Sequence, residues 1–226
     1  MAIFKRPVLE KALARCVSAD ITRCSLHHPF AYKNFIAATN GHIMVAVAHT
    51  EAEDGTYLPL PHLLPTKLDS TPPDIGTLVD QESAKVAADL DACTVVRLPF
   101  APVLALLQKF SEKQTDWVYL LRSQVLAPNE TLRSGKHPLY RDELPEVAVN
   151  PRYLADVIAC LSSEGVENFE AIIRGPIDAV FIRGVVTSPK VTYASAADKE
   201  ACAVPEETSP LFVPTSSFGM IMPIRV

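Results

Sequence analysis

Three short segments with helical periodicity recur along this chain of 226 residues, and strand-like runs follow each of them. A helix with one apolar face must cover another layer of structure, and neighbouring strands supply such a layer. We therefore predict an α+β fold of repeated units, each with one helix followed by antiparallel strands, and with the helices on one face of the sheet. The helices are expected at residues 7–19, 100–112 and 151–161. The strands are expected at residues 21–26, 34–39, 43–49, 116–121, 123–126, 168–174, 179–183 and 219–226.

Turn and capping residues separate these segments. The dipeptide Asn40-Gly41 is the strongest hairpin signal in the chain. Asn150 suits the N-cap of the third helix, because Pro151 follows at the first helical position. A further short helix is expected at residues 81–90, within a segment rich in Pro, Asp and Ser.

Prolines outnumber glycines, with 19 Pro against 8 Gly, where average usage gives about 11 and 16. The sequence contains neither the G-x-x-x-x-G-K nor the G-x-G-x-x-G pattern of phosphate-binding loops. The apolar share of 48% is nevertheless typical of a folded chain. The composition therefore argues for a globular protein and against a standard nucleotide-handling enzyme.

Charge, apolar stretches and cysteine usage narrow the class further. A net charge of −5 argues against coating of nucleic acid by the whole surface but allows a local basic face. No apolar stretch approaches the ~20 residues that span a bilayer, and the first residues lack a signal-peptide pattern. We expect a cytoplasmic protein without membrane contact, cofactor or metal. The cysteines form no C-x-x-C pair and are expected to be small buried apolar residues: Cys16, Cys24, Cys93, Cys160 and Cys202.

Several motifs occur in the order found in one known protein family. Residues 38–46 read Ala-Thr-Asn-Gly-His-Ile-Met-Val-Ala, and residues 137–145 read His-Pro-Leu-Tyr-Arg-Asp-Glu-Leu-Pro. Residues 149–161 follow as a helix and residues 173–183 as a Gly-Pro hairpin, and residues 220–226 end the chain with Met-Ile-Met-Pro-Ile-Arg-Val. With these motifs the chain resembles the sliding clamp family, the beta subunit of bacterial DNA polymerase III, as a shortened or divergent member.

In clamps, these motifs surround a hydrophobic pocket that accepts short peptides of polymerases and of the clamp loader. The resemblance implies that this chain binds such peptides and is not an enzyme, although it departs from the family motifs at Asn40, Ile43 and Asp142. Flexible Met side chains suit varied peptides, but Met and Ile near a terminus are also common core residues. The implied pocket residues are Thr39, Gly41, His42, Met44, Pro138, Arg141, Met220, Met222, Pro223, Ile224 and Arg225.

The resemblance also implies a domain organisation. Residues 1–145 would form a clamp-like domain with a proline-rich insertion at about 51–92. Residues 146–226 would form a shortened C-terminal clamp-like domain with a long loop at 184–218. The alternative is a single clamp domain split by a large insertion. Bacterial clamps pair three-domain subunits into a six-domain ring, so a two-domain chain needs three copies, and a chain with fewer domains closes no standard ring.

Clamp helices line the hole of the ring and present Lys and Arg to the phosphates of double-stranded DNA, a contact that does not depend on base sequence. Lys11 and Arg15 lie four residues apart and therefore share a face of the first helix. The same pattern occurs on solvated helix faces without a partner. The implied DNA-facing residues are Lys11, Arg15, Lys109, Lys113 and Arg152.

The sequence is consistent with three functions. The first is a clamp-like scaffold of DNA replication or repair, which binds polymerase or clamp-loader subunits and encircles DNA as a homo-oligomer. The second is a reduced clamp from a phage or mobile element, which binds the same peptides without forming a ring. The third is an enzyme in which His42 acts with Asp142 or Glu143. It ranks last because no nucleophile, metal set or phosphate loop supports it.

Overall fold

The computed structural model of the chain describes residues 6–88, 93–112, 118–120, 132–134, 147–163, 167–185 and 217–224. The helices are α1 (Arg6–Cys16), the short 3-10 helix η1 (Cys24–Leu26), α2 (Gly76–Ala88), α3 (Phe100–Glu112) and α5 (Pro151–Ser162). The strands are β1 (Phe30–Tyr32), β2 (Phe35–Thr39), β3 (Ile43–His49), β4 (Thr94–Pro99), β5 (Val118–Leu120), β6 (Leu132–Ser134), β7 (Val147–Val149), β8 (Asn168–Ile173), β9 (Val180–Val185) and β10 (Phe218–Ile221).

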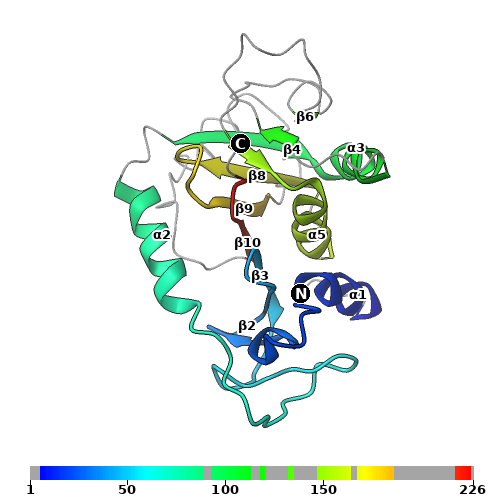
Figure 1. Ribbon diagram of the computed structural model, residues 1–226, viewed down its shortest axis with the longest axis vertical. Coiled ribbons are helices and arrows are strands. Elements are labelled where there is room, and N and C mark those ends of the chain that lie inside the picture. The colour runs from blue at the N-terminus through cyan, green and yellow to red at the C-terminus, as the bar shows by residue number, and fades with distance from the viewer. Residues whose placement is uncertain are drawn as a thin grey trace, which may run out of the picture.

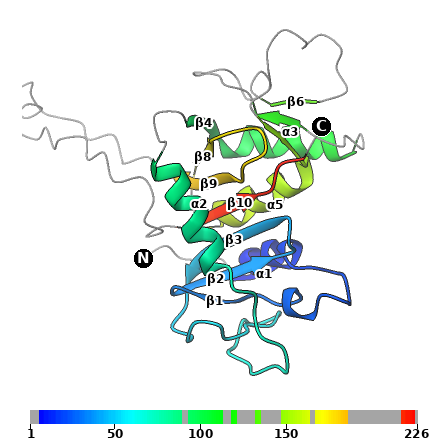
Figure 2. The same cartoon turned by 60° about the vertical axis from the view of Figure 1, so that its left-hand side comes forward.

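A seven-stranded antiparallel sheet with the order β1-β2-β3-β10-β9-β8-β4 forms the centre of the molecule, beside a three-stranded sheet with the order β6-β5-β7. The helices α1, α5 and α3 lie next to one another on one face of the large sheet, with α5 in the middle (Figure 1). The predicted α+β class is thus confirmed. The helix α2 is an addition to the predicted layer, because it packs on the opposite face (Figure 2).

Two units of similar order exchange their first strands. In β4–α3–β5–β6 the first strand pairs with β8, where Thr94 lies opposite Ile173. In β7–α5–β8–β9–β10 the first strand pairs with β5, where Val147 lies opposite Leu120. The predicted domain boundary at residues 145 and 146 stays a prediction, and both exchanged pairs connect its two sides.

The large sheet separates two apolar cores, because successive side chains of a strand point to opposite faces. In β3, Ile43, Val45 and Val47 face the layer of α1, α3 and α5. Met44 and Ala46 face α2 instead. The first core is the larger, and it includes the buried thiols of Cys16 and Cys160, whose Sγ atoms lie 3.6 Å apart.

Local signals account for the elements that the sequence predicted well. The predicted helix at 100–112 coincides with α3, and the cap of α5 is confirmed because the Asn150 side chain accepts hydrogen bonds from the N–H groups of Arg152 and Tyr153. The Asn40-Gly41 turn is also confirmed, with Gly41 at a φ of +91°. The helix expected at 81–90 begins earlier, at Gly76, because Asp74 caps it.

Other predictions were wrong or incomplete. Residues 21–26 form turns and η1 rather than a strand, because no strand in the described part of the chain pairs with them and Ile21 is 82% exposed. The strands β1, β4, β6 and β7 were not predicted, and β10 ends at Ile221. The strand expected at 123–126 and most of the loop at 184–218 lie outside the described residues.

The prediction of buried cysteines is right for Cys16 and Cys160, while Cys93 is half-buried. It is wrong for Cys24, whose side chain is exposed on the short η1 helix. Cys202 lies outside the described residues. Within the described ranges, no helix is long and apolar enough to cross a membrane. The same ranges hold no group of three or more His, Cys, Asp or Glu side chains that is suited to a metal ion.

Gly219 sets the distance between β10 and α5, and this gives a stability prediction. A Cβ atom at Gly219 would lie 2.4 Å from Val157 Cγ1 and 3.2 Å from the Met44 carbonyl oxygen. We expect Gly219→Ala to lower the free energy of unfolding by ~1–3 kcal/mol through overpacking. Urea unfolding of Gly219→Ala, of Val157→Ala and of the double variant measures the energetic coupling between the two positions. The double variant should regain part of the loss, and additive losses would contradict the contact.

Candidate functional site

The turn between β2 and β3 is fixed by its own side chains. The Thr39 hydroxyl donates a hydrogen bond to the Ile43 carbonyl at 2.7 Å and accepts one from the Gly41 N–H at 3.1 Å. The Asn40 side-chain oxygen accepts from the N–H groups of His42 and Ile43 at 2.9 and 3.1 Å. Thr39 and Gly41, two of the predicted pocket residues, therefore hold the turn that presents His42.

The exposed ring of His42 stacks on Tyr153, with ring centroids 5.6 Å apart and an angle of 13° between the ring planes. Tyr153 lies in the first turn of α5, where the Asn150 cap holds the backbone. A turn of one sheet hairpin and the start of a distant helix thus form a joint aromatic surface. The planar stack provides an apolar face with polar ring edges, which suits a peptide side chain.

The segment after β10 is bonded to the β2–β3 turn and to β7. The Met222 N–H donates to the His42 carbonyl at 2.9 Å, and the Ile224 N–H donates to the Ala148 carbonyl at 2.8 Å. The Met222 side chain is 44% exposed. Together these contacts collect a group of exposed and half-buried residues at the end of the sheet. We call this group the end cluster: His42, Tyr153, Met222, Pro223 and Ile224.

Two of the predicted pocket residues have a different environment. Met44 and Met220 lie directly opposite each other on β3 and β10 and are only 4% and 2% exposed. Both belong to the core that α2 covers. The remaining predicted pocket residues, Pro138, Arg141 and Arg225, lie outside the described residues, as do Asp142 and Glu143 of the enzyme hypothesis.

The structure adds two residues that the sequence analysis missed. Tyr153 follows the Asn150-Pro151 cap by two residues, so the cap already marked its place at the helix start. Arg23 donates from Nη1 to the Asn40 carbonyl at 3.4 Å, and its Nε lies 3.6 Å from the Asp20 carboxylate. No local sequence signal connects Arg23 with the β2–β3 turn, because the contact spans 17 residues.

The helix layer carries the predicted cationic residues on its outer side. Lys11 and Arg15 of α1, Lys109 of α3 and Arg152 of α5 are exposed. Because α5 contacts both α1 and α3, these cations lie on one continuous layer. Lys113 lies outside the described residues.

Asp156 is the acidic group within this layer. Its carboxylate lies 3.8 Å from Arg15 Nη1. Burial raises the pKa of Asp156 to about 6, while the charges of Arg15 and Arg152 act in the opposite direction. The negative charge that opposes an anion at this surface therefore decreases as the pH falls through 6.

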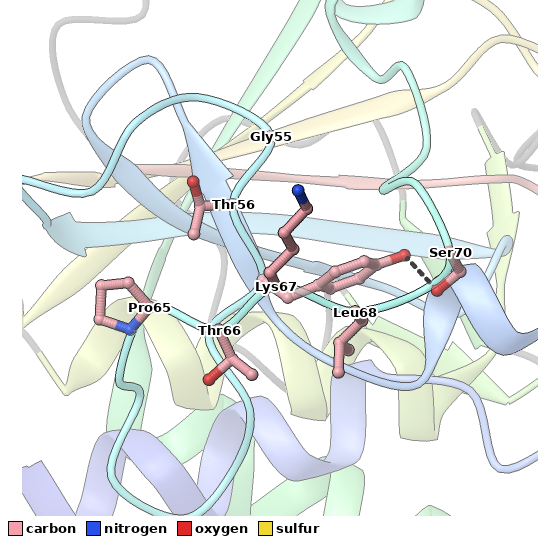
Figure 3. A pocket seen from close by; sticks show the side chains of 8 residues that line it. Gly55, Thr56, Pro65, Thr66, Lys67, Leu68 and Ser70 are labelled. Atoms are coloured by element: carbon pink, nitrogen blue, oxygen red, sulfur yellow. Dashed lines mark hydrogen bonds between the residues drawn. The ribbon is translucent and has the colours of Figure 1, made fainter.

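A separate pocket of about 370 Å³ lies in the segment between β3 and α2, next to the edge of the sheet (Figure 3). Its Tyr57 hydroxyl accepts a hydrogen bond from Ser70 at 3.2 Å and donates one to the Ser25 carbonyl at 3.3 Å. The segment around Tyr57 pairs with the free side of β1, since the Ala31 N–H donates to Thr56. This segment between β3 and α2 thus covers an edge strand that would otherwise expose its backbone.

The raised pKa of Asp156 predicts a pH dependence of stability. Between the unfolded value of 3.8 and about 6 the folded state binds more protons, so the contribution of Asp156 to stability decreases as the pH rises through this range. We expect Asp156→Asn to be more stable than the parent at pH 7.5. Partial solvent exposure limits the gain to about 1 kcal/mol.

Thermal unfolding between pH 4 and pH 8 measures this effect, with the exposed Asp69→Asn as the control for net charge. The advantage of Asp156→Asn should shrink below pH 6. A constant advantage across the range would contradict the assignment.

Comparisons with known proteins address the fold. No family model and no curated protein sequence matches the chain. The DNA polymerase sliding clamp of Bacillus subtilis is similar in structure, with a TM-score of 0.57 and 13% identity over 99% of this chain and 63% of that chain. The DNA polymerase III beta subunit of Thermotoga maritima is similar with a TM-score of 0.56 and 14% identity, over 98% of this chain and 64% of that chain. The sliding clamp of Bartonella birtlesii bound to griselimycin has a TM-score of 0.54 and 14% identity, over 98% of this chain and 63% of that chain.

The chain spans slightly less than two thirds of the length of these solved clamps, and the low identity limits the likeness to the fold. The structural similarity nevertheless extends along nearly the whole of this chain. This α+β chain therefore has the fold of the bacterial DNA polymerase sliding clamps, which its sequence motifs predict.

Proposed function

We propose that the chain is a shortened relative of the bacterial sliding clamps, and that it binds short clamp-binding peptides of polymerase or clamp-loader subunits at the end cluster without enzymatic activity. One observation carries the proposal. Residues 42, 153 and 222 come from three distant segments and meet at one place, through the His42–Tyr153 stack and the bond from Met222 to His42, and His42 and Met222 are exposed there.

The chemistry of the end cluster suits an extended peptide. Met222 is flexible and adapts to different apolar side chains. The stacked rings of His42 and Tyr153 offer a rigid apolar platform, which costs little conformational entropy on binding. Arg23, beside the same turn, supplies a cation for an acidic side chain or a carboxylate of the peptide. Apolar anchors flanked by a few polar groups are typical of linear-peptide sites.

The helix layer supports DNA contact as the second part of this proposal. Lys11, Arg15, Lys109 and Arg152 lie on one side of the large sheet, and the end cluster lies at the end of the strands. Cations on helix faces bind phosphates without reading the bases. Three chains of 24.6 kDa, about 74 kDa in total, would supply the domains of a ring. The mass in solution separates this assembly from a reduced clamp that binds peptides without a ring.

Peptide binding gives the first functional prediction. A labelled peptide with the clamp-binding motif of a bacterial replicative polymerase should bind the full chain in fluorescence anisotropy. Met222→Ala and His42→Ala should each weaken binding by about tenfold, since each removes part of the contact surface. Leu64→Ala, an exposed apolar change in the insertion, is the matched control and should leave affinity unchanged. Equal affinity in all variants would rule out the end cluster as the peptide site.

Salt dependence gives the second functional prediction. A labelled DNA duplex should bind at low ionic strength, and the logarithm of the affinity should fall linearly with the logarithm of the salt concentration. Lys11→Gln together with Arg15→Gln should reduce the slope by about 2, roughly 1 for each lost phosphate contact. Lys67→Gln, in the pocket of Figure 3, removes a charge away from the layer and should leave the slope unchanged. A slope near zero for the parent would eliminate the DNA contact.

A further inference from the structure

The helix α2 covers the face of the sheet on which the two buried methionines lie. Its apolar residues Val79 and Val86 pack in one core with Met44, Met220 and Phe218. Figure 2 shows α2 running across the strands on this side of the sheet. We call the surface formed by Met44, Met220 and Phe218 the methionine face. It adjoins the end cluster, because Met222 follows Met220 by two residues on the same strand path.

We propose that α2 is an internal competitor of the peptide: it covers the methionine face in the free protein, and a bound peptide displaces it to bury apolar anchors there. This inference rests on the proposed function, because it concerns the regulation of the same site. The order of residues supports it. Met222 follows Met220 by two residues, and the bond from its N–H to the His42 carbonyl continues the pairing of β10 with β3. In an extended segment the Met222 side chain therefore lies on the same side as that of Met220, which belongs to the covered face.

The attachment of α2 is smaller than that of the other helices. Three of its thirteen residues are buried, Val79, Ser83 and Val86. In α5, six of twelve residues are buried: Pro151, Leu154, Val157, Ile158, Cys160 and Leu161. The contact of α2 with the sheet therefore buries little apolar area, and little apolar area must be exposed when it leaves.

Ser83 weakens this attachment further. It occupies the middle of the buried stripe of α2, is only 8% exposed, and its hydroxyl has no hydrogen-bond partner among the residues that the structure describes. A buried hydroxyl without a partner costs free energy that it recovers in water. The position thus favours the displaced state of the helix over the packed one.

Polar contacts hold α2 in helical form more than they hold it on the sheet. Asp74 caps its first turn through the N–H group of Gly76, and Glu82 pairs with Lys85 within the helix. The ion pair between Lys33 and Asp80, 3.0 Å apart, ties α2 to the β1–β2 turn. Its partners are 42% and 67% exposed, and such surface pairs contribute little. The helix is therefore able to leave as a unit.

Hydrogen exchange of the full chain, read by mass spectrometry, tests the first half of the inference. In the parent protein, amides of α2 should exchange through a local opening, well before those of β3 and β10. Ser83→Ala removes the buried hydroxyl and should slow the exchange of α2 by about tenfold. Val79→Thr places a hydroxyl in the same stripe at nearly constant volume and should speed it. Gln81→Ala, on the exposed side of α2, is the matched control.

Peptide affinity of the same variants tests the second half. If binding requires the displaced state, the apparent affinity follows the fraction of molecules in which α2 is open. Ser83→Ala should then weaken binding, and Val79→Thr should strengthen it, by the factors measured in exchange. The competition would be overturned if the amides of α2 exchanged at the rate of those of β10, or if both variants bound the peptide with the affinity of the parent. Either result would leave the proposed peptide site intact. Absence of peptide binding in every variant would instead overturn the proposed function, and the competition with it.

Discussion

The backbone pairing of β10 with both β3 and β9 is the interaction on which the rest of the structure depends. Phe218 lies opposite Ala46 on one side and Arg183 on the other, so one four-residue strand joins segments far apart in the chain. Without this pairing, the segment from α1 to β3 would share no sheet with the two units that exchange their first strands. The close approach of Gly219 to Val157 then fixes α5 on the joined sheet, and α5 in turn contacts α1 and α3.

The same strand determines both the core and the candidate site. Because its side chains alternate, Ile221 packs under the helix layer while Met220 packs under α2. The ladder also continues as the single bond from Met222 to the His42 carbonyl, which places an exposed methionine beside the His42–Tyr153 stack. The end cluster is thus a direct consequence of strand register, since a shift by one residue would exchange the inward and outward sets.

The sequence predicted those features that depend on local signals. The apolar period of α3, the Asn150 cap and the Asn40-Gly41 turn each lie within one segment, and each was found correctly. Short strands such as β4 and β7 were missed because they become strands only through exchange with a partner unit. Residues 38–46 and 220–226 pointed to His42 and Met222, but the cover over Met44 and Met220 depends on where α2 packs, which no local pattern encodes.

Ser83 shows why a less stable attachment is consistent with function. A valine at this position would extend the stripe of Val79 and Val86 and avoid the cost of a buried hydroxyl without a partner. Such a helix would stabilise the free protein and, by the same amount, oppose any ligand that needs the methionine face. Sequences tend to break local packing rules where a surface must stay available. The polar residue in the apolar stripe of α2 therefore fits a helix that protects an apolar face from water and still gives way to a partner.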